Sequence, residues 1–542
     1  MEISGGRQKC FVLENIPMSG GKNKRALKRE GFLGNNGSFR FVIVSLLALG
    51  NITLGMAAVM LLARIAPYVS LVLLAAALFV ICGKTVTMRT PDHTLAWSIL
   101  LLAVPFAGLV LYLSWGRVNF TKLEKGFLER SFRRCRDFLQ NEPDAGDALR
   151  EERPEQARQA AVLRREDFPV YRADAGAAKY YPLGELLFED LYRDLEAARD
   201  HIFMCFYIVA DGEVWERLRG ILRRKAAEGV LVRFMYDDMG CVMTLKRDFA
   251  GKLRADGIEV TAFNPIHRYV RQLYLNYRNH RKMCIIDGRV AYAGGINLAD
   301  EYANISSRVG HWKDGGLRFT GGAVRSQTAI FLQIWDMENM MVTEDYNAFC
   351  PEPEEPGPGG MYIAPFADGP ANNPRNPAHT LYQTMCAAAR ESVWYTTPYM
   401  MPDCALREAL CCAAEGGVDV RIITPGIPDH VTVYAATRGH YRRLLDSGVR
   451  VFEYAPGFMH AKMALCDRSS AVVGSINMDS RSFYQHYENA VWIAGGQAVD
   501  DIARDFDALF ARCREIDPAA WDARPMHKKL WQATLSLFSP LF

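Results

Sequence analysis

The sequence lacks two features that mark common classes of protein. None of its 13 cysteines is spaced as C-x-x-C, so neither a zinc site of paired cysteines nor thioredoxin-like redox chemistry is predicted. It also lacks an excess of charge of either sign, because 64 basic and 61 acidic residues give a formal net charge of +3. A protein that holds long nucleic acid by charge alone would be far more basic, so no nucleic-acid partner is expected.

Long apolar runs are present, and they all lie in the N-terminal quarter. Phe41–Ala63, Ile65–Cys82 and Leu95–Trp115 are each long enough, or nearly so, to cross a bilayer as a helix. The tail before them is long and basic, unlike a cleaved secretory signal. We therefore expect a basic cytoplasmic tail over 1–40 and a transmembrane region of two or three spans over 41–116.

Basic residues flank both ends of this apolar region. Since positively charged flanks favour the cytoplasm, an even number of crossings is expected, with one apolar run re-entrant or interfacial. The scattered cysteines favour a reducing compartment for the globular part. The sequence thus predicts a multi-pass protein of the cell membrane whose globular region faces the cytoplasm, while the number of crossings stays open.

Two segments of unusual composition divide the rest of the chain. We expect a polar, charged linker within 117–165, and a second break at Cys350–Gly360 is rich in Pro, Glu and Gly. These segments set the domain boundaries at 166–349 for a first half, 350–361 for a Pro/Gly linker and 362–542 for a second half.

The two halves repeat the same order of elements. In each, a helical pattern stops at Gly before an apolar, β-branched strand, as in Lys225–Asp238 and Cys412–Pro425. Leu253–Pro265 and Leu444–Pro456 form another matching pair. Helices that alternate with apolar strands indicate a mostly parallel sheet flanked by helices in each half. The expected fold class is therefore α/β, with two repeated halves preceded by N-terminal transmembrane helices.

Each half culminates in one polar motif. The first half reads H-x-K-x-x-x-x-D at His280, Lys282 and Asp287, followed by Asn297. In a strand, residues two apart project from the same face, so the imidazole and the ammonium can face one anion. The asparagine amide can donate to a phosphate oxygen, and the Gly-Gly pair before it lets the backbone approach closely.

The second half repeats this motif at identical spacing, with His460, Lys462, Asp467 and Asn477. One such match has only three fixed positions and could arise by chance. Two extended copies, at corresponding places in two repeats, predict a phosphate-binding site shared by the halves.

The duplicated motif resembles the HKD signature of the phospholipase D superfamily. Within it, the order of elements, the apolar Leu95–Arg117 and the closing Ser539–Phe542 resemble bacterial cardiolipin synthases. This resemblance implies that a phosphatidyl group passes from one phosphatidylglycerol to another through a phosphohistidine, giving cardiolipin and glycerol. It implies no cofactor and no metal, and a membrane-embedded enzyme with both lipids as partners.

The resemblance also implies a role for each motif residue. His280 is expected as the nucleophile and His460 as general acid and then general base, although these roles could be reversed. The phosphate oxygens would be held by the lysines and asparagines of both motifs, Lys282, Lys462, Asn297 and Asn477.

Carboxylates should hold the two imidazoles in the right tautomer. By resemblance, Asp314 and Glu488 take these orienting positions, whereas Asp287 and Asp467 act more as structural anchors after the strand. The family usually has Asn two residues before the second carboxylate, where this chain has His486.

Other functions remain open at this point. A phospholipase D hydrolase, which uses water, or a phosphatidylserine synthase, which uses serine, would carry the same motif. A non-catalytic membrane scaffold is disfavoured because both motifs are complete. The C-terminal segment around Trp531, Leu535 and Phe538 suits either a membrane interface or packing against the body. The oligomeric state is not predicted.

Overall fold

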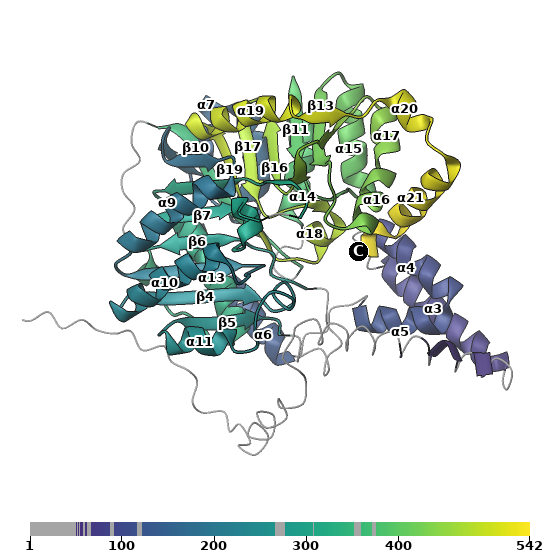
Figure 1. Ribbon diagram of the computed structural model, residues 1–542, viewed down its shortest axis with the longest axis horizontal. Coiled ribbons are helices and arrows are strands. Elements are labelled where there is room, and N and C mark those ends of the chain that lie inside the picture. The colour runs from purple at the N-terminus through teal and green to yellow at the C-terminus, as the bar shows by residue number, and fades with distance from the viewer. Residues whose placement is uncertain are drawn as a thin grey trace, which may run out of the picture.

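Two β-sheets, one formed mainly by each half of the chain, carry the fold of the computed structural model (Figure 1). The structure describes residues 67–86, 91–115, 122–265, 277–306, 308–351, 359–370 and 375–541, with a few isolated positions between 50 and 61. The first sheet has seven strands in the order β2-β9-β7-β6-β3-β4-β5. Their bounds are β2 Ala178–Tyr181, β3 His201–Phe206, β4 Leu231–Asp237, β5 Glu259–Phe263, β6 Met283–Ile286, β7 Val290–Gly294 and β9 Gly316–Thr320.

The second sheet has nine strands in the order β1-β10-β19-β17-β16-β11-β13-β14-β20. Their bounds are β1 Tyr171–Asp174, β10 Gly360–Asp368, β11 Ser392–Thr396, β13 Asp419–Pro425, β14 Arg450–Tyr454, β16 Met463–Cys466, β17 Ser470–Gly474, β19 Glu488–Gly495 and β20 Cys513–Glu515. Between its edge strands β1 and β20, the order of strands matches that of the first sheet one for one. The predicted internal repeat is therefore present in the fold.

Both sheets are mixed, so the prediction of mostly parallel sheets is wrong. Only β3-β4-β5 and β11-β13-β14 pair in parallel, and the other neighbours are antiparallel. One cause lies directly after each motif strand, where the chain reverses in a tight turn and pairs β6 with β7 and β16 with β17 antiparallel. Asp287 and Gly288 have φ of 52° and 62°, and Asp467 and Arg468 have φ of 47° and 50°. Two consecutive residues with positive φ are typical of the turns that join antiparallel strands.

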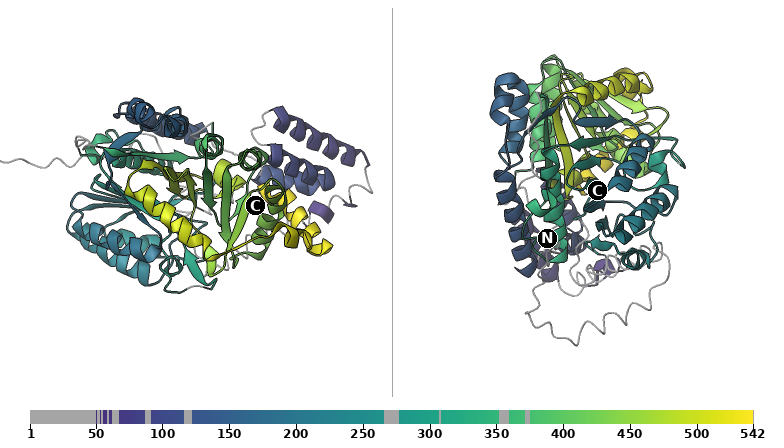
Figure 2. Two further views of the ribbon diagram at one scale, coloured as in Figure 1. Left: turned by 90° about the horizontal axis from the view of Figure 1, so that it is seen from above. Right: turned by 90° about the vertical axis from the view of Figure 1, so that its left-hand side faces the viewer.

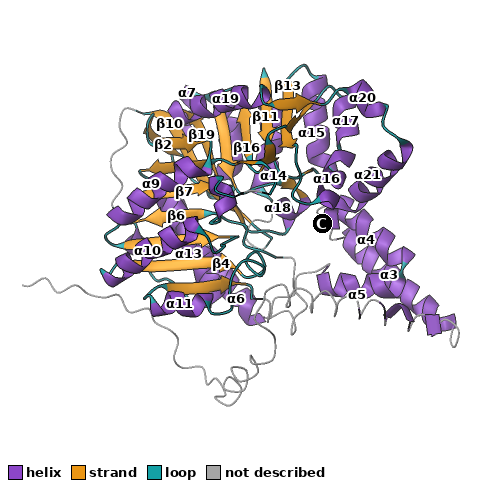
Figure 3. Ribbon diagram, in the orientation of Figure 1, coloured by secondary structure: helices purple, strands orange, loops and turns teal. Residues whose placement is uncertain are grey.

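Helices cover the sheets, and Figure 3 shows them outside the strands. They are α6 Lys122–Gln140, α7 Gly146–Glu152, α8 Pro154–Arg164, α9 Gly184–Ala197, α10 Glu213–Ala227, α11 Phe249–Ala255, α13 Ala323–Asn339, α14 Pro377–Ala388, α15 Cys404–Glu415, α16 Val431–Gly439, α17 Tyr441–Asp446, α18 Ser480–Tyr484, α19 Gln497–Phe510, α20 Pro518–Asp522 and α21 Met526–Phe538. Strand β3 is buried on both faces, which explains its unbroken apolar sequence. Ile202 and Met204 pack with α9 and α10, while Phe203 and Cys205 belong to a core that includes the second half.

Part of the segment expected as a polar linker forms helices that pack on the body. Helix α6 contacts α13, and α8 contacts α14. These helices form a layer on one side of the molecule in the right-hand view of Figure 2. Further along the chain, two short sheets, β12 (Met400–Met401) with β18 (Met478–Asp479) and β8 (His311–Lys313) with β15 (Gly457–Met459), add to the core. The β8–β15 pair joins the two halves directly.

Three helices, α3 Pro67–Val86, α4 Pro91–Ala103 and α5 Pro105–Trp115, stand beside this body (Figure 1). The run expected as one span over Leu95–Trp115 is divided at Pro105 into α4 and α5, which pack against each other. Among the described residues, no helix has the length and apolar character that crossing a bilayer requires. The predicted transmembrane helices are therefore not confirmed, and most of Phe41–Ala63 lies outside the described residues.

Candidate active site

The two polar motifs meet where the halves of the molecule join. His280 and Lys282 directly precede β6, and His460 and Lys462 directly precede β16. Each histidine is fixed by the opposite half, because the His280 backbone N–H donates to the Tyr487 carbonyl (2.9 Å) and the His460 N–H donates to the Lys313 carbonyl (2.7 Å). All four motif side chains are buried. The repeat thus brings two His-Lys pairs into one site.

The orienting carboxylates also cross between the halves. The Nδ1 atom of His280 lies 3.0 Å from both carboxylate oxygens of Glu488, which belongs to the second half. The Nδ1 atom of His460 lies 2.6 Å from Oδ2 of Asp314, which belongs to the first half. Both carboxylates are fully buried. With Nδ1 engaged in this way, Nε2 of each imidazole is the atom left for a ligand.

The two carboxylates are supported differently. Ser475 Oγ donates a hydrogen bond to Glu488 Oε2. At the matching position of the first motif, a Cβ on Gly295 would overlap the Asp314 carboxylate. The residue two positions before the motif asparagine is therefore small in both halves because the carboxylate that faces the histidine lies against it.

The two lysines place positive charge beside the histidines. Lys282 Nζ donates to the His280 carbonyl (2.6 Å), and Lys462 Nζ donates to the His460 carbonyl. Burial lowers the pKa of Lys462 to about 8 and the pKa of Lys282 well below its ordinary value. An anion bound between these ammonium groups would offset the cost of burying their charge.

Burial also sets the protonation of the two histidines. It lowers the pKa of His460 to about 4 and the pKa of His280 well below the usual range, and Lys462 and Lys282 lower them further. Both imidazoles are therefore neutral near pH 7 in these surroundings. A neutral imidazole can act as a nucleophile, whereas proton donation requires a bound anion that raises the pKa again.

The motif asparagines differ in how their side chains are used. Asn297 Oδ1 accepts the Ile208 N–H (3.0 Å), and its Nδ2 donates to the Tyr302 hydroxyl (2.7 Å). Asn477 is buried, and its Oδ1 has no hydrogen-bond partner among the described residues. The unpartnered Oδ1 is an acceptor, so a phosphoryl oxygen could be met only by the Asn477 amide nitrogen, which also hydrogen-bonds Asp479.

The motif aspartates lie at the far end of the motif strands, in the turns. Asp287 accepts the backbone N–H groups of Asp200 and His201 at 2.8 and 2.9 Å. Asp467 does the same for Glu391 and Ser392, also at 2.8 and 2.9 Å. These carboxylates hold the starts of β3 and β11, and among the described residues neither makes a hydrogen bond or ion pair with a motif imidazole.

Aromatic rings surround the histidines, and the motif spacing did not identify them. The Trp312 and Tyr302 rings each lie 5.2 Å from the His460 ring, centroid to centroid, and the Tyr207 ring lies 4.9 Å from the His280 ring. A signal was available in the sequence, since Trp312 stands two residues before Asp314, as His486 stands two residues before Glu488.

His486 occupies the corresponding place beside His280, with ring centroids 5.5 Å apart. It is buried, and neither ring nitrogen has a hydrogen-bond partner among the described residues. Its Nδ1 lies 3.8 Å from Glu488 Oε1. Burial lowers the pKa of His486 to about 3, so the ring is neutral and offers one donor and one acceptor.

One group of side chains in this site has spacing that a metal ion could use. Ligand atoms of His280, His486 and Glu488 lie within 4.8 Å of one another. The ammonium of Lys282 interacts electrostatically with both His280 and Glu488, and Lys462 adds to the positive charge. The surroundings therefore suit an anion such as a phosphodiester better than a cation.

Comparison with known proteins relates the whole arrangement to one family. The family model "Cardiolipin synthase, PLD-like domain" matches residues 191–306 and 382–510, which contain both motifs. The model "Phospholipase_D-nuclease N-terminal" matches residues 72–117.

Relatives match along most of the chain. An "Uncharacterized protein" of Streptococcus mutans is 36% identical over 455 residues, which is 82% of this chain and 96% of the relative. A "Cardiolipin synthase" of Geobacillus kaustophilus is 33% identical over 463 residues, covering 84% and 89%. The crystal structure of a phosphatidylserine synthase from Haemophilus influenzae aligns with a TM-score of 0.56 at 13% identity, covering 71% of this chain and 99% of that chain. At that identity the similarity shows a shared fold.

Proposed function

Because the chain belongs to the cardiolipin synthase family of phospholipase D-like proteins, we propose that it is a phosphatidyltransferase that converts two molecules of phosphatidylglycerol into cardiolipin and glycerol. The observation that carries this proposal is the pair of histidine–carboxylate contacts that cross between the halves, with two buried lysines beside them. This arrangement supplies a nucleophile, a proton donor and positive charge for one phosphodiester.

In the first step, His280 Nε2 attacks the phosphorus of the donor lipid. The bond from phosphorus to the glycerol oxygen breaks, and protonated His460 gives its Nε2 proton to that oxygen, so that free glycerol leaves. The negative charge of the bound phosphodiester raises the pKa of His460 enough for it to carry this proton. The phosphatidyl group remains on His280 as a phosphoramidate.

In the second step, the head-group hydroxyl of another phosphatidylglycerol attacks the same phosphorus. His460 takes the hydroxyl proton, the bond from phosphorus to His280 Nε2 breaks, and cardiolipin is released with both histidines restored. Lys282 and Lys462 stabilise the additional charge on the phosphoryl oxygens in each step, and Asn477 contributes a hydrogen bond. Glu488 and Asp314 keep Nδ1 protonated so that Nε2 can react.

We further propose that Asn297 acts on the phosphate mainly by shaping the loop, since both ends of its amide already bind Ile208 and Tyr302. Asp287 and Asp467 then serve as anchors of the motif strands. His486, where relatives of this family usually have asparagine, contributes a neutral donor to the phosphoryl group on His280.

The lipid substrates place the enzyme at a membrane, and we propose multi-pass residence in the cell membrane with the active site on the cytoplasmic side. The basic segments on both sides of the apolar region support this orientation. Helix α3 exposes large apolar side chains, with Leu71 at 64% and Phe79 at 80%, as a lipid-facing helix would. Extraction of native membranes with alkaline carbonate tests whether the protein is integrated in the membrane, because a peripheral protein would be released.

The reaction is tested by incubating the purified full-length protein in detergent with phosphatidylglycerol alone. Cardiolipin and glycerol in equal amounts are expected. Phosphatidic acid and glycerol would make the protein a hydrolase and contradict the proposal. A parallel incubation with added serine separates the third reaction, since a phosphatidylserine product would identify another acceptor.

A further inference from the structure

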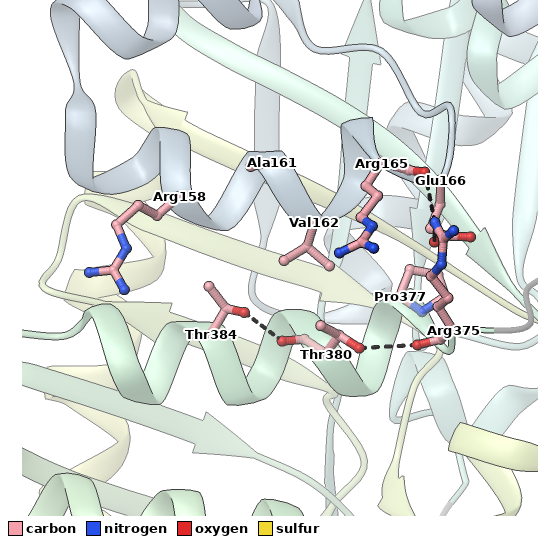
Figure 4. A pocket seen from close by; sticks show the side chains of 9 residues that line it. All are labelled: Arg158, Ala161, Val162, Arg165, Glu166, Arg375, Pro377, Thr380 and Thr384. Carbon is pink, nitrogen blue, oxygen red and sulfur yellow. Dashed lines mark hydrogen bonds and ion pairs between the residues drawn. The ribbon is translucent and has the colours of Figure 1, made fainter. Parts of the chain in front are cut away.

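A cleft separate from the active site lies between helices α8 and α14. Its volume is about 590 Å³, within the range of small-molecule sites. Figure 4 shows Arg165 over the gap between the two helices and Arg158 at the other end of α8, with Thr380 and Thr384 on the α14 side. None of the residues that line it touches the catalytic histidines.

Helical spacing explains how the cleft is built. Arg158, Val162 and Arg165 are four and three residues apart, so they share one face of α8 and its C-terminal turn. Thr380 and Thr384 share one face of α14 in the same way. The two helices pack together, and Val162 and Pro377 add apolar side chains to the lining of the cleft.

The charge of the rim is not balanced. Arg375 pairs with Glu166 (2.9 Å), which accounts for the acidic residue of the lining. Outside the cleft, the neighbouring Arg164 pairs with Asp144 at 2.6 Å. Arg158 and Arg165, however, make no side-chain ion pair or hydrogen bond with any described residue. The unpaired arginines of this helix are therefore the ones at the cleft.

From this geometry we propose that the cleft binds the phosphodiester of an anionic phospholipid. Two guanidinium groups supply forked donors that match phosphate oxygens. The apolar residues of the lining receive the start of an acyl chain, which a free phosphate ester does not have. The cleft is then a second lipid site, separate from the active site, and lipid binding there does not depend on the proposed reaction.

The test uses the full-length protein in detergent with His460→Ala, which stops turnover. A photoreactive short-chain phosphatidylglycerol is crosslinked, and the labelled peptides are mapped by mass spectrometry. Labelling of the α8 and α14 peptides is expected to fall at least tenfold in Arg158→Gln/Arg165→Gln. The matched control, Arg199→Gln/Arg223→Gln, removes the same charge from exposed arginines of the first half and should label as the parent does. Labelling of active-site peptides should persist in both variants.

Two outcomes would overturn the proposal. Equal labelling of α8 and α14 in all three proteins would show that the arginines do not hold the lipid. Competition with dihexanoyl phosphatidylglycerol and with glycerol 3-phosphate identifies the occupant: only the lipid should compete, and equal competition by glycerol phosphate would assign the cleft to a soluble phosphate ester.

Discussion

The two motif histidines, His280 and His460, stand at equivalent places in a repeated fold, yet their surroundings differ. His280 is held by Glu488, which Ser475 supports, and has the polar His486 beside it. His460 is held by Asp314 and lies among aromatic rings. Duplication therefore supplies two imidazoles that each face a carboxylate of the opposite half, and the neighbouring residues give them different environments.

The largest effect on turnover should come from replacing each of the two histidines by alanine in a separate variant. We expect His280→Ala and His460→Ala each to lower turnover of phosphatidylglycerol by about 10⁴-fold or more, because each removes a reacting group. A donor lipid whose leaving group is p-nitrophenol separates the roles of the two histidines, because this leaving group needs no proton to depart. His460→Ala should then form the phosphatidyl-histidine, and His280→Ala should not.

Peptide mapping under acidic conditions is unsuitable for that measurement because phosphoramidates hydrolyse in acid. The adduct is therefore detected after digestion at neutral or alkaline pH. An adduct on His460 in the His280→Ala protein would reverse the assigned roles. Failure of both variants to bind lipid would instead point to damaged folding.

The second comparison concerns the two carboxylates. Replacing Glu488 or Asp314 by its amide keeps the shape but removes the negative charge and can present an N–H donor to Nδ1, so the Nδ1–H tautomer is no longer fixed. We expect a loss in turnover of about 10²- to 10⁴-fold for each. Because Ser475 also donates to Glu488, Ser475→Ala should lower turnover to a smaller extent, and adding it to Glu488→Gln should have little further effect. Full additivity would show that serine acts elsewhere.

Much of this site follows from local sequence, and the part that does not is long-range. The spacing of His280 and Lys282 is visible in the sequence because both lie on one short stretch of chain. The contacts of His280 with Glu488 and of His460 with Asp314 join residues 208 and 146 positions apart. Only family resemblance placed those carboxylates near the site. Neither spacing nor resemblance identified Tyr207.

The fold was also predictable only in part: the order of elements could be predicted, and the direction in which neighbouring strands pair could not. Element order and duplication follow from repeated patterns, but a strand buried on both faces has the same apolar sequence whether its neighbour is parallel or antiparallel. The Asp287–Gly288 dipeptide was the available sign of a hairpin. Similarly, hydropathy treated Leu95–Trp115 as one run, although Pro105 begins a new helix within it.

A smaller effect is expected at the residue that departs from the family. His486→Phe fills the space but removes both ring nitrogens, so turnover should fall on the order of tenfold, the effect of one lost hydrogen bond. His486→Asn retains a donor and should keep turnover within about threefold of the parent. Equal activity of both variants would show that the nitrogens are not used. A matched change on the other side, Trp312→Phe, keeps an aromatic ring against His460 and serves as the control.

The smallest expected effect is on acid stability. Burial lowers the pKa of His486 to about 3 and of His460 to about 4, whereas the unfolded chain has ordinary histidines with pKa near 6.5. Between these values the unfolded state binds more protons, so the free energy of unfolding decreases as the pH falls from about 6.5 toward 4. His486→Asn removes one such group, so its melting temperature should drop less between pH 7.5 and pH 5 than that of the parent or of Trp312→Phe. Thermal melts followed by circular dichroism measure this difference, and an equal drop in all three proteins would mean that His486 is protonated in the folded enzyme.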